Sequence, residues 1–270
     1  MTDSNPLQTT SFRAAAIRTL SRLTLLAACV VSATTAQAAT LQVCSTCPYT
    51  TIQSAVTAAA HGDTIEIAPG SYAESVTITG PRTLSIRASS GRVAIDASGF
   101  AKALEIVHPA GNVLLQDLDL IQADGLAGLI NHGHATLVTV SVVNNVGTFG
   151  GILNSGTLVT NLHSVIAGNE GTGLGSAGGL TNFGWVDMWL TTVTGNRGHE
   201  GGGFNSQGNS RVTVFTSSIS GNLASSIGGG YYTSSPLAVV DIKSSTSFSA
   251  NSAPACAKYF DIHQTPDCVN

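Results

Sequence analysis

The chain has 270 residues, of which 43% are hydrophobic and only 10% are charged, and its formal net charge is −4. This balance excludes an intrinsically disordered chain, because such chains combine low hydrophobicity with high net charge. The length allows one sizeable domain, and the low charge with 30 glycines suits a solenoid with stacked turns.

Residues 1–38 have the features of an export signal. Three arginines precede an apolar stretch from Leu23 to about Ala33, too short to span a membrane, and Ala36-Gln37-Ala38 is a small-x-small cleavage site. The phrase Leu26-Ala27-Ala28-Cys29 also matches a bacterial lipobox, which would place a lipid anchor on Cys29. We favour ordinary cleavage, because only six residues separate Arg22 from Cys29. The sequence thus predicts a secreted, periplasmic or cell-surface protein with no transmembrane segment in the mature chain.

After this cleavage 8 basic and 14 acidic residues remain, a net charge of −6. A nucleic-acid partner is therefore not expected, since such proteins carry a basic surface. The mature chain divides into a predicted N-terminal cap over residues 39–63, a repeat region over residues 64–255 and a C-terminal cap over residues 256–270.

Four cysteines stay in the mature chain, two near each end. An even number in an exported protein predicts disulfides, and Cys44–Cys47 and Cys256–Cys268 are the local choice among three possible connectivities. The spacing of Cys44 and Cys47 also occurs in redox motifs, but no thioredoxin-like βαβ pattern follows it. Zinc would need a second pair of matching spacing, so no metal is expected at these cysteines.

A short helix is predicted over Thr50–Ala60, where it would protect the open end of a solenoid from edge-to-edge pairing. After it, period-2 alternation of apolar residues predicts short strands bounded by turns such as Pro69-Gly70-Ser71-Tyr72. The predicted strands are Thr64–Ala68, Ser75–Thr79, Leu84–Arg87, Val93–Ala97, Ala103–Val107 and Val113–Leu120.

Two asparagine phrases recur later in the chain. In one, an apolar residue stands three places before Asn145, Asn169, Asn196, Asn222 and Asn251, at steps of 24, 27, 26 and 29 residues. In the other, Gly-x-x-Asn places Asn131, Asn154, Asn182 and Asn205, with Thr233 in the Asn place at the next turn. The period predicts a parallel β-solenoid of roughly eight coils, in which inward asparagines bond along two columns. Glycine is expected where a turn needs positive φ. A leucine-rich repeat has a similar period, but its regular Leu-x-x-Leu-x-Leu phrase is missing from this sequence.

The early segments Thr51-Ile52-Gln53-Ser54-Ala55-Val56, Gly62-Asp63-Thr64-Ile65 and Ala68-Pro69-Gly70-Ser71-Tyr72 resemble right-handed parallel β-helix proteins of the pectin-lyase-like superfamily. The later phrases resemble the repeats of polymorphic outer-membrane proteins, and together the resemblance spans about residues 40–252. It implies an all-β, single-domain right-handed parallel β-helix with a short N-terminal capping helix, and only a broad set of functions. Enzymes of this superfamily act on acidic polysaccharides, but the motif set of the polygalacturonase-like hydrolases is absent. No catalytic residue is therefore carried over.

Alternation within the predicted strands points the carboxylates of Glu66, Asp96 and Asp119 outward. If these strands stack in one sheet, the carboxylates lie roughly 5 Å apart, with Arg87 and Asp117 nearby. Such a column would raise pKa values or bind a hard cation such as Ca²⁺. The three residues are the candidates for catalysis, although a solvated face of ordinary carboxylates is the favoured interpretation.

Two further polar groups have simple alternatives. His132 and His134 have strand spacing for one face, but a metal would need a third ligand. Arg197-Gly198-His199-Glu200 gathers functional groups in a glycine-rich loop, where a solvated turn is expected.

Trp189 and Phe215 each stand seven places before a column asparagine, so we expect them in neighbouring coils at an outward or corner position. An aromatic stripe there would stack on sugar rings or dock a partner, unless a loop buries it. The favoured function is an exported, non-catalytic, adhesin-like β-helix module that binds a glycan or surface partner. The alternatives are a polysaccharide lyase or glycoside hydrolase acting on acidic polysaccharide, and a structural envelope component.

Overall fold

The computed structural model describes residues 37–243 and 245–254, which form a right-handed parallel β-helix with one helix. The all-β solenoid predicted from the sequence is thus confirmed. Cys29, Cys256, Cys268 and the predicted C-terminal cap lie outside the described residues, as do residues 1–36 of the predicted export signal. No helix in the described ranges has both the length and the apolar character needed to cross a membrane.

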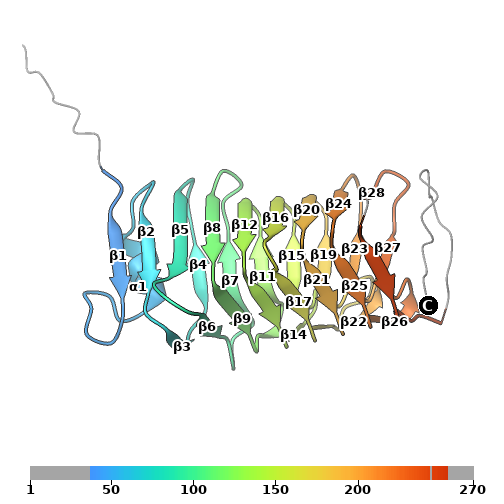
Figure 1. Cartoon of the computed structure of the whole chain (residues 1–270), viewed down its shortest axis with the longest axis horizontal. Helices are drawn as coiled ribbons and strands as arrows, with labels where there is room; N and C mark the ends of the chain where they lie inside the picture. The colour runs from blue at the N-terminus through green and yellow to red at the C-terminus, as the bar shows by residue number, and fades with distance from the viewer. Residues whose placement is uncertain (1–36, 244, 255–270) are drawn as a thin grey trace, which may run out of the picture. The chain divides into compact units, whose positions relative to one another are not determined.

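Sheet A is the longest sheet. It takes one strand from each coil and adds β1 before the first coil, so its strands follow one another in chain order along the solenoid (Figure 1). Its nine strands are β1 (Thr40–Val43), β2 (Thr64–Ile67), β5 (Thr83–Ala88), β8 (Asn112–Gln116), β12 (His134–Val138), β16 (Thr157–Asn161), β20 (Trp185–Trp189), β24 (Arg211–Phe215) and β28 (Val239–Ile242).

Sheet B follows sheet A in each coil, and its eight strands indicate eight coils. They are β3 (Gly70–Ala73), β6 (Val93–Asp96), β9 (Leu118–Ile121), β13 (Ser141–Val143), β17 (Val165–Ala167), β21 (Thr192–Thr194), β25 (Ser218–Ser220) and β29 (Ser247–Ser249).

Two further sheets complete the coils. Sheet D consists of β10 (Asp124–Gly125), β14 (Val146–Gly147), β18 (Glu170–Gly171), β22 (Arg197–Glu200) and β26 (Leu223–Ile227). Sheet C consists of β4 (Val76–Ile78), β7 (Lys102–Ile106), β11 (Ala127–Asn131), β15 (Ile152–Asn154), β19 (Leu180–Asn182), β23 (Phe204–Ser206) and β27 (Tyr231–Thr233).

Alternation along each strand decides which side chains enter the core. In β20, Val186 and Met188 are buried, whereas Trp185, Asp187 and Trp189 face outward. The neighbouring strands hold the same register, so apolar side chains of successive coils stack into one continuous core. Because period 2 fixes the inward set, it also fixes the outward set that builds the candidate site.

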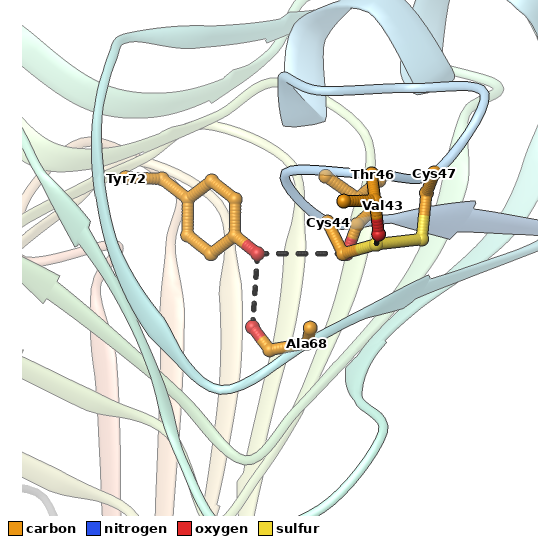
Figure 2. Close-up of a disulfide and its surroundings, with 6 residues drawn as sticks. All are labelled: Val43, Cys44, Thr46, Cys47, Ala68 and Tyr72. Carbon is orange, nitrogen blue, oxygen red and sulfur yellow. Dashed lines mark hydrogen bonds between the residues drawn. A yellow bond between two sulfur atoms is a disulfide. The ribbon is translucent and has the colours of Figure 1, made fainter.

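The N-terminal cap is tied down by side chains from several elements. Helix α1 (Ile52–Ala58) packs against β1, β2 and β4, and the carboxylate of Glu74 accepts hydrogen bonds from the backbone N–H groups of Ile52 and Gln53 at 2.8 and 2.9 Å. The local disulfide Cys44–Cys47 is present as predicted. Beside it, the Tyr72 hydroxyl donates to the Ala68 carbonyl oxygen at 2.9 Å (Figure 2). Burial is the main reason why the pKa of Tyr72 is raised, with a smaller contribution from the charge of Glu74.

The first asparagine column is fully buried at the corner between sheets B and D. Each member after Asn145 accepts hydrogen bonds from the backbone N–H and side-chain amide of the preceding Asn, and every member donates to a core carbonyl one coil earlier. Asn196 Oδ1 accepts from Asn169 N and Nδ2, both at 3.0 Å, and Asn196 Nδ2 donates to Ile166 O at 2.9 Å. The repeat therefore satisfies every link of a buried amide ladder from Asn145 to Asn251.

The second column departs from the prediction at one member. Asn131, Asn154 and Asn182 are paired in register and bonded at 2.8 Å per step. The next place belongs to Ser206, whose Oγ accepts from Asn182 Nδ2 at 3.4 Å, while Asn205 pairs with Thr181 on the outer face. The assignment of Asn205 to this ladder is therefore wrong.

The glycines of the second phrase have a different role from the one expected. Gly128, Gly151 and Gly179 do not adopt positive φ. Instead, an added Cβ at Gly151 would lie only 2.7 Å from the side-chain nitrogen of Asn169. Each glycine thus leaves room for an amide of the first column, which couples the two phrases.

Candidate functional site

The outer face of sheet A carries three rows of side chains over its last coils. The first row pairs Trp185 with Arg211, and the third pairs Trp189 with Phe215. Between them runs the floor, in which Asp187 pairs with Thr213 and Thr213 with Asp241. Successive members of a row lie about 4.8 Å apart, and the two outer rows about 13 Å apart at their backbones.

These rows enclose a surface groove with a volume of about 440 Å³ that runs across the strands. Trp185 and Arg211 form one wall, and Trp189, Phe215 and Lys243 form the other. Trp185 is 65% exposed and Trp189 is 42% exposed, which is unusual for the largest apolar side chains. We call this feature the aromatic groove; its lining residues are Thr157, Trp185, Val186, Asp187, Trp189, Arg211, Thr213, Phe215, Asp241 and Lys243.

The expected contact between Trp189 and Phe215 is present. Their ring centroids lie 3.7 Å apart with an interplanar angle of 8°, because both residues end adjacent strands in the same register. One face of the Trp189 ring is therefore covered by Phe215. The Trp189 side chain nevertheless keeps 42% of its surface exposed.

The corner beside this wall is backbone-strained and apolar. Leu190, which follows Trp189, has φ +49°, and Leu162, one coil earlier, has φ +48°. Both side chains are exposed, at 37% and 48%. A non-glycine residue in the left-handed region is disfavoured by roughly 1–2 kcal/mol. The same conformation occurs after other strands of sheet A, at Asp117, Thr139 and Thr216, so the turn is a feature of the fold and the exposed leucines are what distinguish these two coils.

Charge within the aromatic groove is unevenly paired. Asp241 Oδ2 lies 2.5 Å from Lys243 Nζ and 3.7 Å from an Arg211 guanidinium nitrogen. Arg211 Nε also donates to the Thr213 hydroxyl at 3.4 Å. Asp187 is exposed on the floor between the two tryptophans. The groove thus offers one paired and one available carboxylate.

The predicted column of Glu66, Asp96 and Asp119 does not exist. Glu66 lies on β2 in sheet A, whereas Asp96 and Asp119 lie on β6 and β9 in sheet B. Within sheet B, Asp119 pairs with Ala94, and Asp96 pairs with Ile121, so even these two are not stacked. A Ca²⁺ site built on these three carboxylates is excluded by this geometry.

Each of these carboxylates has its own local partner. Glu66 Oε1 lies 3.1 Å from a guanidinium nitrogen of Arg87. Asp119 accepts from Arg92 Nε at 3.1 and 3.0 Å, and this hydrogen bond is the main reason why the pKa of Arg92 is raised. The pKa of Asp96 is lowered by hydrogen bonds from the Ser98 hydroxyl and backbone N–H, at 2.6 and 3.0 Å. Each carboxylate is therefore engaged with a local partner and not with the other two.

The histidines and the charged segment near residue 200 do not form a metal site. His132 follows β11 of sheet C and His134 begins β12 of sheet A, so a corner separates them, contrary to the shared face expected. The segment Arg197–Glu200 is a strand of sheet D rather than a loop. Within the described ranges, no three His, Cys, Asp or Glu side chains gather closely enough to hold a metal ion.

The sequence drew attention to Trp189 and Phe215 but not to the rest of the groove. The missed residues are Trp185, Asp187, Arg211, Asp241 and Lys243. A signal was available, because Trp185 and Asp187 stand four and two places before Trp189 on a strand of period 2. Asp241 and Lys243 lie beyond an irregular turn, which hid their register.

Comparison with known proteins supports the fold alone. No protein-family model matches the chain, and no curated protein matches it. Among solved structures, the chain is similar to the pectin methylesterase from Aspergillus niger, with a TM-score of 0.50 over 81% of this chain and 91% of that one. The sequence identity is 13%, so the likeness shows a shared fold and nothing of the site. The right-handed parallel β-helix implied by the resemblance of the N-terminal segments is confirmed.

Proposed function

We propose that this chain is an exported, non-catalytic β-helix module that binds a glycan in the aromatic groove. The observation that carries the proposal is the pair of exposed tryptophans, Trp185 and Trp189, on opposite walls of one groove. Two large apolar rings held in water cost free energy unless a ligand covers them. Sugar rings have apolar faces that stack on aromatic rings, and their hydroxyls match a floor made of Asp187 and Thr213.

The strained corner supports the same proposal. Leu162 and Leu190 expose apolar side chains from left-handed backbone next to the Trp189 wall. The backbone strain belongs to this corner in every one of these coils, but only here are the side chains exposed leucines, which extend the apolar surface beside the groove.

Export is supported by the pattern of residues 1–38 and by the disulfide Cys44–Cys47, which persists in oxidising compartments. The similar solved structure is named a pectin methylesterase, and a carbohydrate ligand would suit a fold shared with it.

The test is binding of oligosaccharides to the folded chain, first on a glycan array and then by titration in solution. Trp189→Ala should weaken binding about thirtyfold, from lost apolar area and ring stacking. Phe100→Ala is the matched control, because Phe100 is 41% exposed and does not line the aromatic groove. Equal binding by the two variants would contradict the proposal.

A catalytic role of the same groove is the second candidate. Asp187 and Asp241 flank Thr213 on the floor, which places their backbones two coils apart, about 9–10 Å. Inverting glycosidases use two carboxylates separated by roughly 6.5–9.5 Å. Against this role, Asp241 is already held by Lys243 and Arg211. Release of reducing ends from a polysaccharide by the parent chain, abolished in Asp187→Asn, would favour catalysis over binding alone.

A further inference from the structure

Asp187 differs from Asp241, the other carboxylate of the aromatic groove, in its ion pairs. Among the described residues, no lysine, arginine or histidine forms an ion pair with it, although Arg211 and Lys243 line the same groove. Both of those cations are directed at Asp241. Asp187 thus has no ion-pair partner in the groove, although the two cations and the two carboxylates of the lining balance in number.

The surroundings of Asp187 are aromatic. Trp185 and Trp189 stand two residues before and after it on the same face of β20, each about 6.7 Å away along the strand. Aromatic faces attract cations, most strongly those of tryptophan. A positive group that reaches the floor between the tryptophans would thus meet a carboxylate and two ring systems at once.

We propose that the aromatic groove selects a glycan whose sugar rings carry protonated amines, with one ammonium group bound by Asp187 between Trp185 and Trp189. This inference rests on the proposed function and names its ligand class: a cationic amino-sugar oligomer.

The unpaired charge of Asp187 favours an amino sugar over the other sugar classes. A neutral sugar leaves Asp187 with hydroxyl partners only, and hydrogen bonds between two charged groups are stronger than those from neutral donors. A uronate would bring its own negative charge next to Asp187 and Asp241, and like charges at this distance repel. Arg211 and Lys243 balance the two carboxylates in number, but both form their ion pairs with Asp241, so the repulsion beside Asp187 is offset only in part.

The test compares three oligomers of equal length: a glucosamine tetramer, its N-acetylated counterpart and tetragalacturonate. Affinities are measured by titration at low salt and at a pH where the amine is protonated. The glucosamine tetramer should bind most tightly, and tetragalacturonate most weakly. Asp187→Asn should lower the ratio of glucosamine to N-acetylglucosamine affinity about fivefold, the value of one exposed charge pair.

Asp124→Asn serves as the matched control, because Asp124 is an exposed carboxylate on β10 in sheet D. It should leave the affinity ratio of the parent chain unchanged. Equal affinity for the charged and N-acetylated tetramers, or a ratio that survives in Asp187→Asn, would overturn the amine selection while the glycan-binding proposal stands. Failure of all three tetramers to bind would overturn both.

Discussion

Replacement of Asn196 by alanine tests whether the amide ladder holds the coils together. The side chain is fully buried and makes four hydrogen bonds: two accepted from Asn169, and one donated to each of Ile166 O and Asn222 Oδ1. Asn169 Nδ2 keeps its bond to Val142 O, and Asn222 Oδ1 keeps the backbone N–H of residue 196. The Asn169 backbone N–H, however, loses the partner that the structure gives it.

A buried donor left without a partner costs about 1–3 kcal/mol. With the loss of the bond to Ile166 O, the expected destabilisation is about 3 kcal/mol. For a domain of this size each kcal/mol lowers Tm by about 2–4 °C, so Asn196→Ala should melt about 6–12 °C below the parent.

The measurement is thermal unfolding followed by circular dichroism at neutral pH. Asn209→Ala is the control, because Asn209 is exposed in the turn before β24 and should leave Tm nearly unchanged. The same Tm for the two variants would refute the reasoning that the columns stabilise the solenoid.

Three other predictions follow from the structure. Leu190→Gly should raise Tm slightly, because glycine relieves the strain of a φ of +49°, and it should weaken glycan binding. A lower Tm with unchanged glycan binding would contradict the proposal that this corner contacts the ligand. Gly151→Ala should destabilise the fold by several kcal/mol, because the added Cβ would collide with the side chain of Asn169. Gly208→Ala, at an exposed glycine, should destabilise the fold less. Equal unfolding curves for the two variants would refute the close approach. The pKa of Tyr72 is raised in the folded state, so its contribution to stability is fully present below its unfolded pKa, about 10, and is lost as pH rises through the folded pKa. Denaturant titrations at rising pH should therefore show a smaller loss of stability at alkaline pH in Tyr72→Phe than in the parent chain. An identical loss in the two chains would contradict this prediction.

The repeat could be predicted from the sequence because the same positions of each coil are buried. Apolar residues at period 2 fix which side chains enter the core, and a buried amide must be satisfied, so Asn145 to Asn251 could be placed as a column without coordinates. The second column failed at Asn205 because three consecutive glycines, Gly201 to Gly203, allow two registers. The observed register aligns Ser206, three residues after Gly203, with Asn182.

The carboxylate column failed for a related reason. The residue that pairs with Glu66 is Arg87, only 21 positions later, whereas Asn222 and Asn251 are 29 positions apart in their column. Because corner lengths vary this much between coils, a step of 30 residues from Glu66 to Asp96 does not identify the sheet on which each strand lies. Trp189 and Phe215 were found correctly in neighbouring coils, since both are counted from the same ladder of asparagines.

The most direct measurement uses the chain's own fluorescence. The only tryptophans in the 270 residues are Trp185 and Trp189, and both line the aromatic groove, so tryptophan emission reports on this site alone. Titration with amino-sugar and neutral oligosaccharides should change the emission of the parent chain in a saturable way, and binding measured by calorimetry should be lost in Trp185→Ala/Trp189→Ala. Emission that stays constant while calorimetry records binding, or binding that survives in the double variant, would contradict the assignment of the glycan site to this groove.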